Sequence, residues 1–292
     1  MRIDAHHHLW DLKAVHYPWL MAKGETRFFG DPAPIQRDFL IQEFCCDAKA
    51  AGFEGSVHIQ VGAEDGLAEA EWVQSVADAH PHWPMKQVVF CDLTAADLSA
   101  KLDAFQALPT VCGVRQIVGR APGEDAVTGT NMLRDDPSFA RGLQMAGDRG
   151  VSFDLQLIPE LMAKTAAVLS NAPDTQVALC HAGSPHNRSP EGLRQWADAL
   201  SGLSALPNVV CKLSGFGMFA HDWTTESIRP IVEVCLDQFG PDRCMFGSNF
   251  PVDSLYSDYA TLVESITSLV PAAAQKAVLG DTAAAFYGFS DL

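Results

Sequence analysis

Short apolar stretches rich in β-branched residues recur along the whole chain, and longer amphipathic stretches separate them. Most of the short stretches are apolar at nearly every position rather than at alternate positions, which is typical of parallel strands buried on both faces. Eight of them are candidate strands: 2–8, 56–61, 86–91, 111–117, 151–157, 176–181, 208–213 and 243–248.

The stretches between these candidates carry the spacing and the end signals of helices. Residues 66–79 place apolar side chains at 67, 70, 73 and 76–77, which is a helical period. Asp136 followed by Pro137 is a typical helix start, and Gly150 ends that stretch. Further helices are predicted over 38–51, from 189 onward, over 225–239 and over 257–269.

The alternation of strand and helix predicts a parallel sheet with right-handed crossovers. Eight such units in 292 residues fit a closed (β/α)8 barrel, and no Gly-rich phosphate loop favours the alternative, a doubly wound open sheet. No flexible linker divides the chain, so we expect one α/β domain over 1–292. The polar segment 11–37 is long for a loop between strand and helix and should lie over the catalytic face of the barrel.

Composition and charge narrow the class of protein. The chain has 20 Lys and Arg against 36 Asp and Glu, a formal net charge of −16, which argues against a nucleic-acid or anionic membrane surface. No apolar run reaches the ~18 residues of a membrane span. The eight cysteines form no CxxC pair and the first residues lack a signal pattern, which indicates a cytoplasmic protein with reduced thiols. We expect a small-molecule substrate, and the sequence leaves a homo-oligomer open.

Histidines end two of the predicted strands. His6 and His8 are two residues apart on the first strand, so both should face the barrel interior at its catalytic end. His181 ends the sixth strand and should point toward them across the barrel mouth. Converging imidazoles can bind a divalent metal or polarise a carbonyl group.

Other polar residues at strand ends are weaker candidates. Asn249 ends the eighth strand, and Asp253 follows in the loop. Arg115 and Lys212 lie inside apolar stretches and need anionic partners, either on a ligand or in a structural ion pair. His58 and Gln60 end the second strand, in positions that suit a supporting role.

Together these residues resemble the amidohydrolase superfamily, and within it the amidohydrolase-2 branch that includes lactonases acting on sugar and dicarboxylate lactones. The resemblance runs in order over nearly the whole chain. The matching stretches are IDAHHHLW at 3–10, VHIQ at 57–60, GVRQ at 113–116, HAG at 181–183, CKLSG at 211–215 and FGSNFP at 246–251.

The resemblance implies a site built from His6, His8 and His181, which match the family pattern. Asn249 stands where the family usually has Asp, and an amide cannot accept a proton at neutral pH. Strands four and five lack the ligands of a second metal, because they offer Arg115 with Gln116 and Asp154 with Gln156. The resemblance therefore implies either no required cofactor or one divalent metal, zinc before others, on the three histidines.

The implied function is hydrolysis of a small lactone. In this hypothesis the three histidines surround the carbonyl oxygen, directly or through one metal, and a water attacks the carbon. The catalytic base is Asp253, Asp154 or one of the histidines, and Asn249 enters the site. The expected substrate-binding residues are Arg115, Lys212, His58, Gln60, Trp10 and His221. Two alternatives remain: a metal-dependent decarboxylase of the same branch, and a ligand-binding barrel without catalysis.

Overall fold

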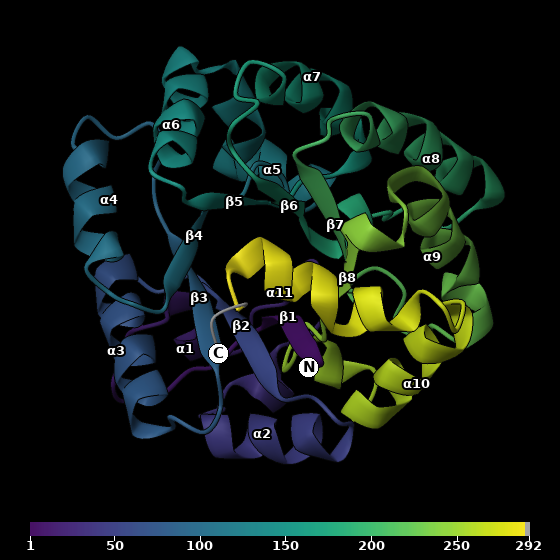
Figure 1. The fold of residues 1–292 in the computed structure, drawn as a ribbon, viewed down its shortest axis with the longest axis horizontal. Helices are drawn as coiled ribbons and strands as arrows, with labels where there is room; N and C mark the ends of the chain where they lie inside the picture. Colours follow the sequence, from purple (N-terminus) through teal and green to yellow (C-terminus); the bar gives the residue numbers. More distant parts are fainter. Residues whose placement is uncertain (290–292) are drawn as a thin grey trace.

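Eight parallel strands form one sheet that closes into a barrel in the computed structural model, which describes residues 1–289 (Figure 1). The strands, each paired with the next along the chain, are β1 (Ile3–His7), β2 (Gly55–Ile59), β3 (Met85–Phe90), β4 (Val111–Arg115), β5 (Ser152–Leu155), β6 (Val177–Leu179), β7 (Val209–Leu213) and β8 (Cys244–Phe246). Just past β8, the backbone N–H of Asn249 donates to the carbonyl oxygen of His6 at 2.7 Å. The backbone N–H of His8 donates to the carbonyl oxygen of Phe250 at 2.7 Å. These two bonds join the end of the last strand to the first strand. The predicted (β/α)8 barrel is confirmed, and residues 290–292 of the predicted domain lie outside the described part.

The helices are α1 (Pro18–Met21), α2 (Ile41–Ala50), α3 (Gly66–Ala79), α4 (Leu98–Gln106), α5 (Pro122–Thr128), α6 (Pro137–Asp148), α7 (Pro159–Leu169), α8 (Pro190–Ser204), α9 (Thr225–Phe239), α10 (Tyr259–Leu269) and α11 (Thr282–Tyr287). Figure 1 shows a ring around the barrel, in chain order, that consists of α2, α3, α4, α6, α7, α8, α9 and α10. Asp136 caps α6 as predicted, because its side chain accepts the N–H of Ser138. No helix within residues 1–289 is long and apolar enough to cross a membrane.

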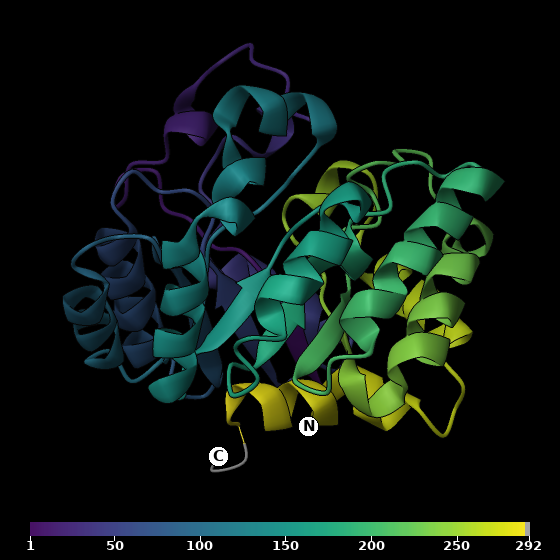
Figure 2. The same cartoon turned by 90° about the horizontal axis from the view of Figure 1, so that it is seen from above.

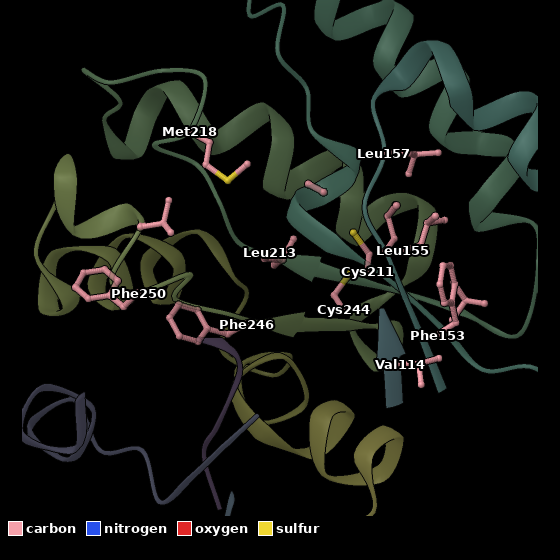
Figure 3. Packing of buried hydrophobic residues seen from close by; sticks show 14 of the residues in the cluster. Val114, Phe153, Leu155, Leu157, Cys211, Leu213, Met218, Cys244, Phe246 and Phe250 are labelled. Atoms are coloured by element: carbon pink, nitrogen blue, oxygen red, sulfur yellow. The ribbon is translucent and has the colours of Figure 1, made fainter. Parts of the chain in front are cut away.

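Apolar side chains fill two layers, one on each side of the sheet. The outer layer lies between strands and helices, where Figure 3 shows Val114 of β4 and Phe153 and Leu155 of the neighbouring strand β5. The inner layer fills the barrel. Its strand residues are Ile3, Ala5, Val57, Ile59, Val88, Ala178, Val210 and Met245. Because most strand residues are buried on both faces of the sheet, the strands are largely apolar.

The two ends of the barrel are covered differently. Helix α11 packs Ala283 and Tyr287 against the inner layer at the end where the strands begin. Figure 2 shows α11 at this end in yellow, while the purple segment that contains α1 and the teal region around α5 rise beyond the opposite end. The end of the barrel that α11 leaves open is therefore the carboxyl end of the strands. Segment 11–37, which contains α1, lies over this end as predicted.

A β-bulge in β1 sets the direction of the histidines. Asp4 pairs with Ser56 and His7 pairs with His58. The chain therefore advances three residues on β1 while it advances two on β2, so β1 holds one extra residue. The extra residue allows Ala5 and His6 both to face the barrel interior, although adjacent residues of a regular strand point to opposite faces. His8 then faces inward as well, and His7 stacks outward on Phe44 at 3.8 Å between ring centres.

Candidate active site

Three buried histidines meet at the carboxyl ends of the strands. The ring centre of His6 lies 5.1 Å from that of His8 and 4.5 Å from that of His181. Both ring nitrogens of His6 lack a hydrogen-bond partner within residues 1–289. The structure thus brings together the three histidines predicted from the strand ends.

The chain turns sharply at two of these strand ends. His181, Ala182 and Ser184 after β6 and Asn249 after β8 all have positive φ values, between 51° and 57°. Non-glycine residues seldom adopt this left-handed region, and such strain gathers at functional sites. Contacts from outside hold the first turn: Ser214 accepts the backbone N–H of His181 at 3.2 Å, and Trp196 donates to the carbonyl of Ala182 at 2.8 Å.

Burial keeps the histidines neutral. It lowers the pKa of His6 and of His181 well below the ordinary value, and nearby Lys212 and Arg115 add to the effect. Burial likewise lowers the pKa of His8, to about 3. Nδ1 of His8 lies 2.7 Å from the carbonyl oxygen of Ile59, which can only accept, so this nitrogen carries the proton. Nε2 of His8 then carries a lone pair and faces the side-chain amide of Asn249, whose Oδ1 lies 3.2 Å away.

Lys212 and Asp154 form a buried ion pair inside the barrel. Nζ of Lys212 lies 2.5 Å from Oδ2 of Asp154 and 2.8 Å from the carbonyl oxygen of Ala5. The hydroxyl of Tyr287 on α11 donates to the same carboxylate at 2.9 Å. Both charged side chains are fully buried and fully engaged. Lys212 and Asp154 are thus structural partners, which is the second of the two roles that the sequence leaves open for Lys212.

A cavity of about 300 Å³ opens above the histidines. Its polar lining residues are His8, Arg27, Gln60, Arg115, Arg120, Gln156, His181 and Asn249, and its apolar wall includes Trp19, Phe28, Phe29 and Met218. Gln60 and Arg115 thus lie where we expected substrate contacts. Arg115 donates to the carbonyl oxygen of Gln60 at 3.1 Å and to the side chain of Gln156.

Three expected substrate contacts lie elsewhere. Val57 and Ile59 fill the barrel, so His58 between them faces the helices, where its ring lies 3.7 Å from Glu69. Trp10 is buried and donates to the carbonyl of Arg37 at 2.6 Å. His221 is exposed and stacks on Tyr256 at 4.0 Å, outside the cavity lining. None of these three side chains lines the cavity.

Asp253 lies buried behind the cavity wall. Burial raises the pKa of its carboxyl group to about 7, while the Asn249 amide and the backbone of Gly217 lie close enough to lower it in part. No hydrogen bond of standard geometry reaches its oxygens from the described chain, and Arg188 is its cationic neighbour. Asp253 is therefore a proton-binding group near neutral pH, one layer away from the cavity.

Sequence reasoning did not single out several residues of this site. Ser214 could have been found, because it lies two residues after Lys212 and a strand carries both to one face. Trp19 and Arg27 lie in the long segment 11–37, and no periodicity places a loop residue in space.

One group of metal donors is close together. A nitrogen of His6, a carboxylate oxygen of Asp154 and Sγ of Cys180 lie within 4.8 Å of one another, so this group could hold an ion. Asp154 is already bound by Lys212, and burial raises the pKa of the Cys180 thiol to about 11. His6 fits a metal best, because its buried ring nitrogens are unpartnered within residues 1–289 and two further imidazoles flank it.

Comparison with known proteins agrees with this geometry. The uncharacterized protein y4mH of Sinorhizobium fredii is 36% identical over 291 residues, which cover 98% of this chain and 97% of that protein. An L-fucono-1,5-lactonase of Burkholderia multivorans is 29% identical over 310 residues, covering 100% of this chain and 97% of that enzyme. A crystal structure of an amidohydrolase from Burkholderia multivorans with bound zinc has 26% identity and a TM-score of 0.84, with 99% of both chains covered. Residues 3–289 match the amidohydrolase family model, and the chain belongs to that family.

Proposed function

We propose that this amidohydrolase opens a lactone by attack of water on the ester carbonyl. One observation carries the proposal: the neutral imidazoles of His8 and His181 and a buried guanidinium line a cavity at the catalytic end of the barrel, and the ring of His6 lies against both imidazoles. A relative at 29% identity is named as a lactonase, which supports an ester of this class.

His181 is the proposed proton acceptor. The hydroxyl oxygen of Ser214 lies 3.0 Å from Nδ1 of His181. When Nδ1–H donates a hydrogen bond to this oxygen, Nε2 keeps a lone pair for the cavity that His181 lines. A neutral imidazole can take a proton from water as water attacks. Negative charge that develops on the substrate raises the proton affinity of this ring during the reaction.

Arg115 is the proposed stabiliser of the developing oxyanion. It is 4% exposed, and both its bonded acceptors, the carbonyl of Gln60 and the amide oxygen of Gln156, are neutral. Its charge is thus held in place without a carboxylate to neutralise it. If a divalent ion such as zinc is part of the enzyme, His6 with His8 and His181 would hold it through their lone pairs, and it would polarise the lactone carbonyl. His181 could then not be the proton acceptor, because its lone pair would already be bound.

Proton release from a panel of γ- and δ-lactones tests the proposal. We expect turnover by the wild-type protein, a loss of at least about a hundredfold in kcat/KM for His181→Ala, and no loss for His82→Ala. His82 is a suitable control because it is exposed before β3, at the opposite end of the barrel. Equal activity of the His181→Ala and wild-type proteins would overturn the proposal. Assays before and after chelation, with zinc added back, decide whether the ion is required.

A further inference from the structure

The lining of the cavity divides into a polar part and an apolar part. Six polar residues lie at a strand end or within three residues of one: His8, Gln60, Arg115, Gln156, His181 and Asn249. Apolar side chains come from segments beyond the strand ends, and these include Trp19, Phe28, Phe29 and Met218. Figure 2 shows the purple segment with α1, which carries Trp19, rising beyond the strands. A ligand thus meets polar groups at the strand ends and apolar groups above them.

The apolar part, which we call the aromatic wall, consists of Trp19, Phe28, Phe29 and Met218. Between ring centres, Trp19 lies 6.0 Å from Phe29, and Phe29 lies 5.2 Å from Phe28. The indole N–H of Trp19 donates to the carbonyl oxygen of Val61 at 2.7 Å, so its one hydrogen-bonding group is already engaged. A hydroxyl group placed against this wall would lose its water without gaining a partner of equal strength.

The two arginines of the covering segments are balanced by carboxylates. Oε1 of Glu124 lies 3.1 Å from Nη2 of Arg27 and 3.0 Å from Nη1 of Arg120. The buried Asp125 is a second carboxylate of this group, and it accepts the backbone N–H of Arg120 at 2.8 Å. Two guanidinium groups and two carboxylates cancel in formal charge, so this part of the cavity does not require an acidic group on the substrate.

The position of the reacting groups directs the substrate in the cavity. The carbonyl group must lie near His181 and Arg115 at the strand ends, where hydrolysis creates a carboxylate. The rest of the molecule then extends toward the aromatic wall. The cavity volume of about 300 Å³ is at the lower end of the range for small-molecule sites, which suits one small ring with a short side chain.

We propose that the substrate is a lactone with a short apolar side chain, an alkyl group that packs on the aromatic wall. This inference rests on the proposed lactone hydrolysis and names its substrate class. Water adds to the ring carbonyl carbon, the ring carbon–oxygen bond breaks, and the ring oxygen takes up a proton as a hydroxyl group. The product is an alkyl-substituted hydroxy acid, which releases one proton at neutral pH.

A matched pair of lactones tests the contact with the wall. γ-Ethyl- and γ-hydroxymethyl-γ-butyrolactone have side chains of nearly equal size and differ by a methyl group in place of a hydroxyl group. We expect wild-type kcat/KM to be at least about tenfold higher for the ethyl lactone. A longer alkyl chain should raise it by about threefold for each added CH₂ group that reaches the wall. Equal values for the pair, or a higher value for the hydroxymethyl or γ-carboxylate lactone, would overturn the inference.

Two wall variants test whether these side chains cause the preference. Met218→Gln keeps the length of the side chain and places an amide in the wall, so it should remove most of the preference through a higher KM for the ethyl lactone. Phe28→Asn should do the same, and Phe28 is only half-buried, which makes this change easier for folding. Met132→Gln is the matched control, because Met132 is 58% exposed and lies outside the cavity lining. An unchanged preference in both wall variants would overturn the inference.

Binding of γ-lactams separates the inference from the proposed hydrolysis, because a lactam resists ring opening. Calorimetry should show that the γ-lactam with the ethyl group binds more tightly than the one with the hydroxymethyl group, and that Met218→Gln removes the difference. The ethyl lactam should also give the more negative heat-capacity change, which marks buried apolar surface. This result with no lactone turned over would uphold the apolar site and reject hydrolysis; equal binding of both lactams would reject the apolar site alone.

Discussion

Ser214 holds His181 by two contacts, since its hydroxyl lies 3.0 Å from the ring Nδ1 and 3.2 Å from the backbone nitrogen. One small side chain therefore fixes both the direction of the ring and the left-handed turn that carries it. Gly215 leaves room for this arrangement, because a Cβ there would lie 2.5 Å from Nδ1. The proposed base is thus set in place by the end of the neighbouring strand.

Ser214→Ala should lower kcat by roughly tenfold or more with little change in KM, because the ring loses the partner that orients it. Ser214→Thr keeps the hydroxyl group and should retain more activity than Ser214→Ala. Steady-state kinetics of the two variants on one lactone checks this. Equal kcat values for Ser214→Ala and the wild type would show that His181 needs no such support.

The pH dependence of the rate should distinguish two candidate bases. The pKa of His181 is well below 6.5, so a reaction that uses its neutral ring should show no loss of kcat/KM between pH 8 and pH 6. Asp253 has a pKa of about 7, so its use as the base would give a loss over the same range. A pH–rate profile, corrected for spontaneous hydrolysis, makes the measurement. An acid limb near pH 7 that disappears in Asp253→Asn would assign the base to Asp253.

Asn249→Asp should raise kcat/KM, because a carboxylate beside the cavity can accept a proton and the amide cannot. Asp253 lies next to this position, so the two carboxyl groups would compete for one proton. The gain should therefore be larger at pH 8 than at pH 6. A fall in kcat/KM at both pH values would show that the amide itself is required.

The barrel and the three histidines could be predicted because both rest on local patterns. Apolar runs marked every strand, and strand ends marked His6, His8 and His181. The partner of Lys212 could not be read, since Asp154 is 58 residues away and only the closed barrel brings them together. His58 and Gln60 share a strand period, yet only Gln60, which directly follows β2, lines the cavity.

Removing one member of the buried ion pair should destabilise the protein strongly. Lys212→Met leaves Asp154 buried without its cation, and such a loss costs about 3–5 kcal/mol of the free energy of unfolding. The double variant Lys212→Met/Asp154→Leu should recover part of it. Urea unfolding checks both. A Lys212→Met protein with wild-type stability but a raised KM would restore the substrate-binding hypothesis.

Asp253 should make stability depend on pH. Its pKa rises from an unfolded value near 3.8 to about 7 on folding, so the folded state holds the proton more tightly. The resulting stabilisation is complete below about pH 4 and is lost as the pH rises through about 7, at about 1.4 kcal/mol per pKa unit. Asp253→Asn should therefore gain stability relative to wild type between pH 5 and pH 8. Unfolding at both pH values measures this, and parallel curves for the two proteins would contradict it.

Hydrolysis of a lactone in water enriched in heavy oxygen tests the central claim most directly. The account predicts a ring-opened hydroxy acid with one heavy oxygen in the new carboxyl group, because water attacks the carbonyl carbon and the ring oxygen leaves. Mass spectrometry of the product locates the label. Heavy oxygen in the new hydroxyl group, or loss of carbon dioxide with the ring intact, would contradict the account.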